Sequence, residues 1–216
     1  MANFRTHITV AAAGGALLAC AGYQLQGWPP LQALAACALT AFGGILPDID
    51  ADHSRSSRLI FTLLAVPALG VGGVLLQTWL SPGALLLACG GIYIGVRYVG
   101  GTLFSRLTVH RGSWHSLLAA VLCTWAVAAF SYHWLAQPGW LAWLHGLAVL
   151  AGFLIHLVLD EIYSVDLAGG RLKRSFGTAL KPFDCHRPAS SLLMLVATAA
   201  LLPWLPPWEA LGALLV

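Results

Sequence analysis

The chain has 216 residues, a length that fits one domain, and 59% of them are hydrophobic, with a mean hydropathy of +0.80. Only 9% are charged, which lies far outside the range of soluble globular proteins and is typical of an integral membrane protein. The small net charge of +3, carried by scattered basic residues, argues against nucleic-acid binding. The apolar blocks lack a two-residue alternation, so we expect an all-α, multi-pass protein that forms one membrane domain over residues 1–216.

Apolar blocks separated by turn residues predict about seven membrane-spanning helices. In chain order they cover residues 6–23, 31–47, 59–80, 84–98, 113–135, 140–162 and 189–205. The first block ends near Cys20 and partly resembles a lipoprotein signal peptide, but the single preceding Arg5 favours a retained helix. The sixth block leads into the one long polar segment, residues 164–188.

All eleven basic residues fall on one side of this predicted arrangement. They precede the first helix or lie at or after the ends of the second, fourth and sixth helices: Arg5, Arg55, Arg58, Arg97, Arg106, Arg111, Arg171, Lys173, Arg174, Lys181 and Arg187. The connections on the opposite side contain no Lys or Arg. The positive-inside rule therefore predicts that the N-terminus and the polar segment 164–188 are cytoplasmic.

The same predicted face collects histidine and aspartate side chains from four separate segments. These are His7; Asp48, Asp50, Asp52 and His53; His110 and His115; and His156 and Asp160. Carboxylates beside a bilayer are costly unless a cation pairs with them. The gathering of these groups on one face therefore predicts a metal site.

The local spacings agree with this prediction. His156 and Asp160 are four residues apart, so a helix presents both on one face. Asp48 and Asp50 follow a proline, where a non-helical backbone can direct two carboxylates to one centre, and Gly112 permits a turn between His110 and His115. Ligand sets of His and Asp without Cys favour Zn²⁺, Mn²⁺ or Fe²⁺ over Ca²⁺.

Each group also has a simpler interpretation. A lone histidine at a membrane interface is commonly hydrogen-bonded, and Asp48 to Asp52 could pair with Arg55 and Arg58. The His156 and Asp160 pair could cap a helix or join two helices. The metal site is favoured because all of these groups occur on one predicted face.

These residues resemble the YdjM-like, LexA-regulated inner-membrane proteins, a family described as metal-dependent hydrolases. The motifs that carry the resemblance are Thr6-His7, Leu46-Pro47-Asp48-Ile49-Asp50, His110-Arg111-Gly112 with His115-Ser116, and His156-x-x-x-Asp160. The chain departs from the family pattern at Trp114 and at Ala51-Asp52-His53. The order of ligands is also similar to that of the zinc-dependent phospholipase C and single-strand nuclease superfamily, which hints at phosphoester chemistry.

The resemblance implies a protein of the bacterial inner membrane with its site on the cytoplasmic side. The expected metal ligands are His7, Asp48, Asp50, His110, His115, His156 and Asp160, holding one to three divalent ions, with zinc preferred and Mn²⁺ or Fe²⁺ as alternatives. We expect a metal-activated water to hydrolyse a phosphoester of a membrane lipid, with His110, Asp50 and Arg111 in the catalytic set. Arg111 would hold a phosphate oxygen, or would only fix the topology.

Three alternatives stay open at this point. One is a metal-dependent amide or acyl-ester hydrolase, which Ser113 or Ser116 could assist. The others are a divalent-cation transporter and a membrane scaffold with a structural metal. Transport is disfavoured because the middles of the apolar blocks carry no charged residues along which an ion could move. The oligomeric state stays open as well.

Overall fold

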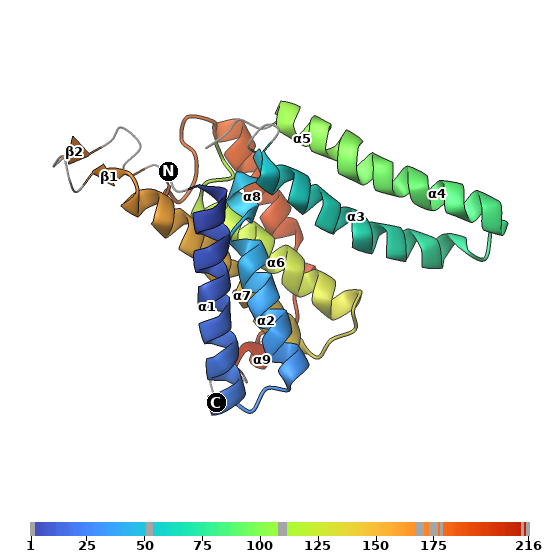
Figure 1. The fold of residues 1–216 in the computed structure, drawn as a ribbon, viewed down its shortest axis with the longest axis horizontal. Helices are drawn as coiled ribbons and strands as arrows, with labels where there is room; N and C mark the ends of the chain where they lie inside the picture. Colours follow the sequence, from blue (N-terminus) through green and yellow to red (C-terminus); the bar gives the residue numbers. More distant parts are fainter. Residues whose placement is uncertain are drawn as a thin grey trace. The chain divides into compact units, whose positions relative to one another are not determined.

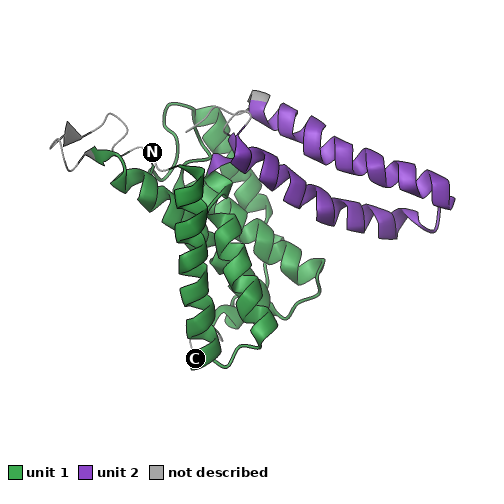
Figure 2. Cartoon of the chain, in the orientation of Figure 1, with its two compact units in different colours: residues 1–47, 111–216 green, residues 48–110 purple. Residues whose placement is uncertain are grey.

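The computed structural model describes residues 3–50, 54–107, 112–166, 171–172, 177, 179–212 and 214 (Figure 1). The described part confirms the all-α prediction, because helices are interrupted only by a two-residue antiparallel pairing of β1 (Val165–Asp166) with β2 (Arg171–Leu172). The chain divides into two compact units, residues 1–47 with 111–216 and residues 48–110 (Figure 2).

The larger unit is built around one long buried helix, α7. Its helices are α1 (Phe4–Leu25), α2 (Pro30–Gly43), α6 (Leu117–His133), α7 (Gly139–Ile162), α8 (Pro188–Ala200) and α9 (Glu209–Gly212), with a short 3-10 turn, η3 (Leu202–Trp204). The helix α7 contacts α1, α2, α6 and α9. Its most apolar window is 67% buried, against 17% for that of α1, so α7 forms the core of this unit.

Glycines allow α2 and α7 to approach each other closely. A Cβ atom added at Gly152 of α7 would lie 1.9 Å from the carbonyl oxygen of Thr40, and one added at Gly43 of α2 would lie 2.2 Å from that of Val149. Only glycine fits such a backbone contact. The crossing therefore brings the end of α2 against the middle of α7, about one turn before His156.

The helix α2 ends earlier than the sequence predicted. We expected a helix to residue 47, but α2 stops at Gly43 and is followed by a 3-10 helix, η1 (Leu46–Asp50). Pro47 explains this end, because a proline ring clashes with the carbonyl group four residues earlier in an α-helix. The residue four positions before Pro47 is Gly43.

The smaller unit is a helical hairpin that follows η1. It contains α3 (Arg55–Leu76), α4 (Pro82–Ile94), a π-helical segment η2 (Gly95–Gly100) and α5 (Gly101–Leu107). The predicted fourth helix ended near residue 98, which was too short, because no proline interrupts residues 83–107 and the helix continues through η2. Within this unit the ring of Phe61 packs edge-on to that of Phe104 at 5.8 Å.

Four helical runs are long and apolar enough to cross a membrane: Phe4–Leu25, Arg55–Leu76, Pro82–Ser105 and Gly139–Ile162. Three further apolar runs are shorter, at Pro30–Gly43, Leu117–His133 and Pro188–Trp204. The 14 residues of α2 span about 21 Å, less than the roughly 30 Å of a hydrocarbon core. The seven predicted blocks thus correspond to helices, while seven full crossings and a cytoplasmic N-terminus stay predictions.

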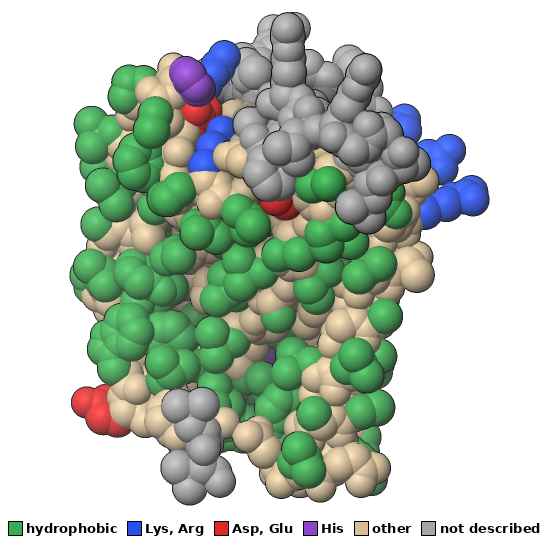
Figure 3. All heavy atoms as spheres, turned by 90° about the vertical axis from the view of Figure 1, so that its left-hand side faces the viewer, with side chains coloured by type: hydrophobic (Ala, Val, Ile, Leu, Met, Phe, Trp, Pro, Cys, Tyr) green, Lys and Arg blue, Asp and Glu red, His purple; other side chains and the backbone are tan. Residues whose placement is uncertain are grey.

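Hydrophobic side chains are spread over the face that Figure 3 shows, and the Lys and Arg side chains visible there lie toward one end of it. Many of the large apolar side chains are highly exposed, such as Leu17 of α1 at 73% and Leu193 of α8 at 71%. An apolar surface of this extent in a chain with this composition is the expected surface of a membrane protein.

Candidate metal centre

Four predicted ligands meet in the interior of the larger unit. They are His7 of α1, His115 in the turn before α6, and His156 and Asp160 of α7, and none is more than 2% exposed. The ligand atoms of His7, His156 and Asp160 lie within 4.8 Å of one another, a grouping that could hold a metal ion. The sequence had assigned all four to one site from three separate motifs.

Local structure fixes the segments that carry these residues. Asn3 caps α1 by accepting a hydrogen bond from the backbone N–H of Thr6 at 2.9 Å, so His7 falls in the first turns of that helix. Ser116 caps α6 by accepting from the N–H of Ala119 at 3.3 Å, which holds His115 just outside the helix. His115 itself donates its backbone N–H to the carbonyl of Gly112 at 3.3 Å, in the turn that the glycine was expected to permit.

Asp160 lies between two imidazole rings. Its Oδ1 is 3.2 Å from Nε2 of His7, and its Oδ2 is 4.0 Å from Nε2 of His115. The rings of His7 and His156 stack with centroids 3.7 Å apart and an interplanar angle of 11°. The ring of His115 meets that of His156 edge-on, at 5.6 Å and 68°. Three imidazoles therefore surround one carboxylate in a buried volume.

A backbone carbonyl sets the tautomer of His156. Nδ1 of His156 lies 2.7 Å from the carbonyl oxygen of Gly44, which can only accept a hydrogen bond, so Nδ1 carries the proton. The lone pair then resides on Nε2, the atom that faces a metal in many histidine sites. The close crossing of α2 and α7 thus supplies the carbonyl that orients this ring.

The donor set fits a divalent transition metal. Three imidazoles and one carboxylate match the ligand types of zinc, manganese and iron sites, without the all-oxygen shell that Ca²⁺ takes. A buried carboxylate is costly unless positive charge compensates it. Nδ1 of His7 is also buried and has no hydrogen-bond partner among the described residues, so this ring retains an unused donor or acceptor in the centre.

The structure of the larger unit does not test the remaining predicted ligands. Asp48 and Asp50 lie on η1 at the start of the smaller unit, where Asp48 Oδ2 accepts a hydrogen bond from Ser56 Oγ at 3.3 Å. Their role as ligands stays a prediction. His110, Arg111, Asp52 and His53 lie outside the described residues, so their predicted roles are not tested.

The sequence did not indicate two features beside the centre. The first is the backbone carbonyl of Gly44, which no side chain in the sequence marks and which reaches His156 only because the two helices cross.

The second is Glu161, which was left out of the site because it lies off the face of His156 and Asp160. Its carboxylate accepts hydrogen bonds from the backbone N–H groups of Gly177 and of Ala179, the latter at 3.3 Å. Gly177 has a φ of +77°, a left-handed conformation that favours glycine. Glu161 therefore anchors the polar segment to the end of α7.

Comparison with known protein families matches residues 1–172 to the family described as YdjM inner membrane protein. No curated protein and no solved structure matches the chain. The likeness to the zinc-dependent phospholipase C and nuclease superfamily has no support from these comparisons and stays a prediction. The matched range includes His7, His115, His156 and Asp160 and ends before α8. Because it covers most of the sequence, the chain belongs to the YdjM inner membrane protein family.

Proposed function

We propose that this protein is a metal-dependent hydrolase of the inner membrane that acts on a phosphoester of a membrane lipid. The observation that carries the proposal is the buried grouping of His7, His156 and Asp160, whose ligand atoms lie within 4.8 Å of one another. His115 is the fourth member, through its 4.0 Å contact with Asp160. Such a donor set at the end of an apolar helix is unusual for purely structural packing, because each buried polar group must be compensated.

A bound divalent ion, zinc by preference, would supply a water of lowered pKa and would polarise a phosphoryl oxygen. The protein's own groups prepare the site for it. The Gly44 carbonyl holds the proton on Nδ1 of His156 and leaves Nε2 as a ligand atom. Asp160 provides the negative charge, and its two oxygens face His7 and His115. Burial strengthens these interactions, since little water screens them.

The proposed reaction is a simple displacement at phosphorus. A bond forms between the water oxygen and phosphorus, the bond from phosphorus to the leaving oxygen breaks, and that oxygen takes up a proton. We assign the proton transfer to His110 and the binding of a phosphate oxygen to Arg111 on sequence grounds. An amide or acyl-ester hydrolase would use the same donor set, and the substrate assay below separates the two.

A structural metal is the second candidate, and one observation favours it. His7, His156 and Asp160 are at most 2% exposed, whereas a catalytic ion keeps one open coordination position. Transport is less favoured, because α7 carries no Asp, Glu, Lys or Arg before Asp160 and thus offers no charged path through its middle.

The experiment is a lipid assay with the purified, zinc-loaded protein. Vesicles containing phosphatidylglycerol, phosphatidylethanolamine, cardiolipin or an isoprenoid phosphate are incubated with the protein, and the products are read by mass spectrometry. The proposal expects a released headgroup or phosphate that is absent with Asp160→Asn and retained with His145→Ala, a histidine about four turns before Asp160 on α7. Identical product profiles for all three proteins would contradict the hydrolase, and released fatty acid would favour the acyl-ester alternative.

A further inference from the structure

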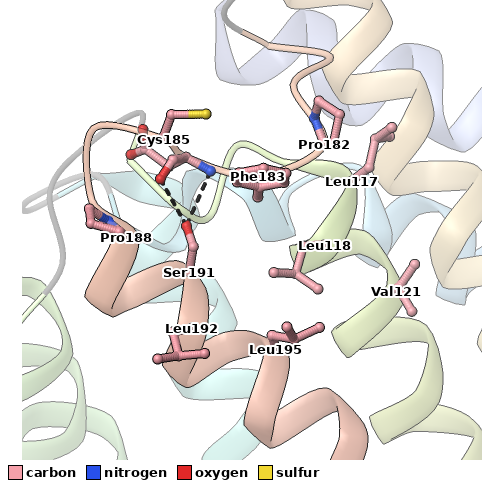
Figure 4. Close-up of a pocket in the computed structure, with 11 residues that line it drawn as sticks. Leu117, Leu118, Val121, Pro182, Phe183, Cys185, Pro188, Ser191, Leu192 and Leu195 are labelled. Atoms are coloured by element: carbon pink, nitrogen blue, oxygen red, sulfur yellow. Dashed lines mark hydrogen bonds between the residues drawn. The ribbon is translucent and has the colours of Figure 1, made fainter.

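An apolar groove lies between the starts of two helices in the larger unit, close to the metal centre. It has a volume of about 600 Å³ and is lined by Leu117, Leu118 and Val121 of α6, by Pro188, Ser191, Leu192 and Leu195 of α8, and by residues 182–185 (Figure 4). This volume is in the range of small-molecule binding sites. The groove uses α8 and the preceding segment, which lie beyond the range matched to the family.

The walls of the groove are hydrocarbon. Figure 4 shows Leu118 and Leu195 between the two helices, with Phe183 above them. On α8, Ser191, Met194 and Thr198 are buried, while Leu192 and Leu195, which line the groove, are 61% and 53% exposed. Exposed leucines in an apolar groove favour a hydrocarbon chain over water as its occupant.

One end of the groove is polar and rigid. Asp184 is buried, with 4% of its surface exposed. Its backbone N–H donates a hydrogen bond to Ser191 Oγ at 3.2 Å, and the Ser191 hydroxyl donates one to the Asp184 backbone carbonyl at 3.0 Å. The dashed lines in Figure 4 mark both hydrogen bonds. The Asp184 carboxylate accepts from the backbone N–H of His186 at 3.2 Å and pairs with Lys181 Nζ at 3.5 Å. Arg187, exposed at the start of α8, adds a second cation at this end. Asp184, which lines the groove, compensates the charge of Lys181, so Arg187 is the cation that an anionic head would meet at this end of an apolar groove.

The polar end is linked directly to the turn that carries His115. The backbone N–H of Leu117 donates to the carbonyl of Lys181 at 2.9 Å, and that of Leu118 donates to the carbonyl of Pro182 at 3.0 Å. Leu117 follows His115 by two residues, so their Cα atoms are at most about 7 Å apart. A lipid whose tail fills the groove therefore has its head at the same end of α6 as the candidate metal centre.

From these observations we propose that the groove binds one acyl chain of an anionic phospholipid and positions its head beside the metal centre. The inference rests on the proposed function for the identity of the lipid as a substrate, but the binding itself needs no hydrolysis. It names the substrate class as a glycerophospholipid with a negatively charged head, which Arg187 attracts, because basic residues near a membrane surface favour anionic lipid.

The test is photo-crosslinking to the full-length protein in vesicles that contain phosphatidylglycerol with a diazirine near the end of one acyl chain. Crosslinked peptides are identified by mass spectrometry. We expect labels concentrated on residues 117–121 and 192–195, and a reduction of several-fold at these positions in Leu118→Trp and in Leu195→Trp, whose larger rings fill the groove. Leu193→Trp is the matched control, because Leu193 is on α8, 71% exposed and not part of the groove lining.

Several outcomes decide the proposal. Labels spread evenly over α8 and unchanged in both groove variants would overturn it, as would labelling of the groove by an isoprenoid phosphate probe in preference to phosphatidylglycerol. The single variant Leu195→Trp, at an exposed position, keeps the test valid if Leu118→Trp does not fold. Crosslinking with Asp160→Asn separates the two proposals, because we expect the groove to be labelled in this variant even if no lipid is hydrolysed by any form of the protein.

Discussion

The two histidines of α7 have opposite environments, although they lie on one helix. His145 has a single described polar contact of its ring, Nδ1 at 2.7 Å from the hydroxyl of Ser131 on α6. His156 has its Nδ1 fixed by a backbone carbonyl, stacks on a second imidazole and meets a third, beside a buried carboxylate. One ring is satisfied by a neutral neighbour, as a core histidine is, while the other belongs to a buried group of imidazoles and a carboxylate that could hold a metal ion. A histidine on an apolar helix therefore indicates a metal site only when further imidazoles or carboxylates lie beside it.

Removing the carboxylate should have the largest effect. In Asp160→Asn the amide keeps the size of the side chain but loses its charge, so we expect the affinity for zinc to fall by more than about 100-fold, beyond the 10–100-fold typical of groups that only support a ligand. Competition with a chromogenic chelator in detergent measures this. An unchanged affinity would place the metal elsewhere.

Metal removal should lower stability only when the centre is intact. A ligand present at 100 times its Kd stabilises the folded state by about 2.7 kcal/mol. We therefore expect excess EDTA to lower the Tm of the wild-type protein and of Ser131→Ala, and to leave that of Asp160→Asn unchanged. A Tm that is insensitive to EDTA in the wild-type protein would contradict a bound metal.

Two glycines of α7 pack against different helices, Gly152 against α2 and Gly146 against α6. An added Cβ would lie 1.9 Å from the Thr40 carbonyl oxygen at Gly152 and 2.7 Å from the Thr124 carbonyl oxygen at Gly146. Both Gly152→Ala and Gly146→Ala should cost about 1–3 kcal/mol of stability through overpacking. Only Gly152→Ala should also weaken zinc binding, because it displaces α2 and the Gly44 carbonyl that orients His156.

The control for this pair is Gly90→Ala in the smaller unit, where an added Cβ meets nothing within 4 Å. Thermal melts in detergent, with and without zinc, measure all three variants. Equal loss of the zinc-induced Tm shift in both α7 variants would show that general destabilisation, and not the orientation of His156, controls the metal.

The smallest effect is expected at the other histidine. Ser131→Ala removes the hydroxyl that contacts His145 and should cost about 1 kcal/mol, the net value of one hydrogen bond. Zinc affinity should not change. A loss of metal in this variant would mean that the two ends of α7 are coupled, contrary to the comparison.

The sequence predicted most of α7 and of the centre for clear physical reasons. The helix was expected over residues 140–162 and is Gly139–Ile162, because turn residues mark its start and a continuous apolar run its body. His156 and Asp160 share a face by helical periodicity alone. The predicted topology placed His7 and His115 on the same membrane face as these two residues, because short connections return the chain to the same end of the bundle.

Other features depend on tertiary contacts that leave no pattern in the sequence. The Gly44 carbonyl becomes a hydrogen-bond acceptor for His156 only because Gly43 and Gly152 let two helices meet. Pro47 made the end of α2 at Gly43 predictable, but we predicted that the helix would extend to Pro47 itself. Glu161 was left out because it lies off the helix face of His156 and Asp160, and its hydrogen bonds to backbone N–H groups of a distant segment leave no pattern in the sequence.

The most direct test of the metal centre is the metal content of the detergent-purified protein, measured by inductively coupled plasma mass spectrometry for the wild type, His156→Ala and His145→Ala. The account predicts at least one zinc, manganese or iron ion per chain in the wild type and in His145→Ala, and a background level in His156→Ala. No transition metal in the wild type, or the same content in all three proteins, would contradict it.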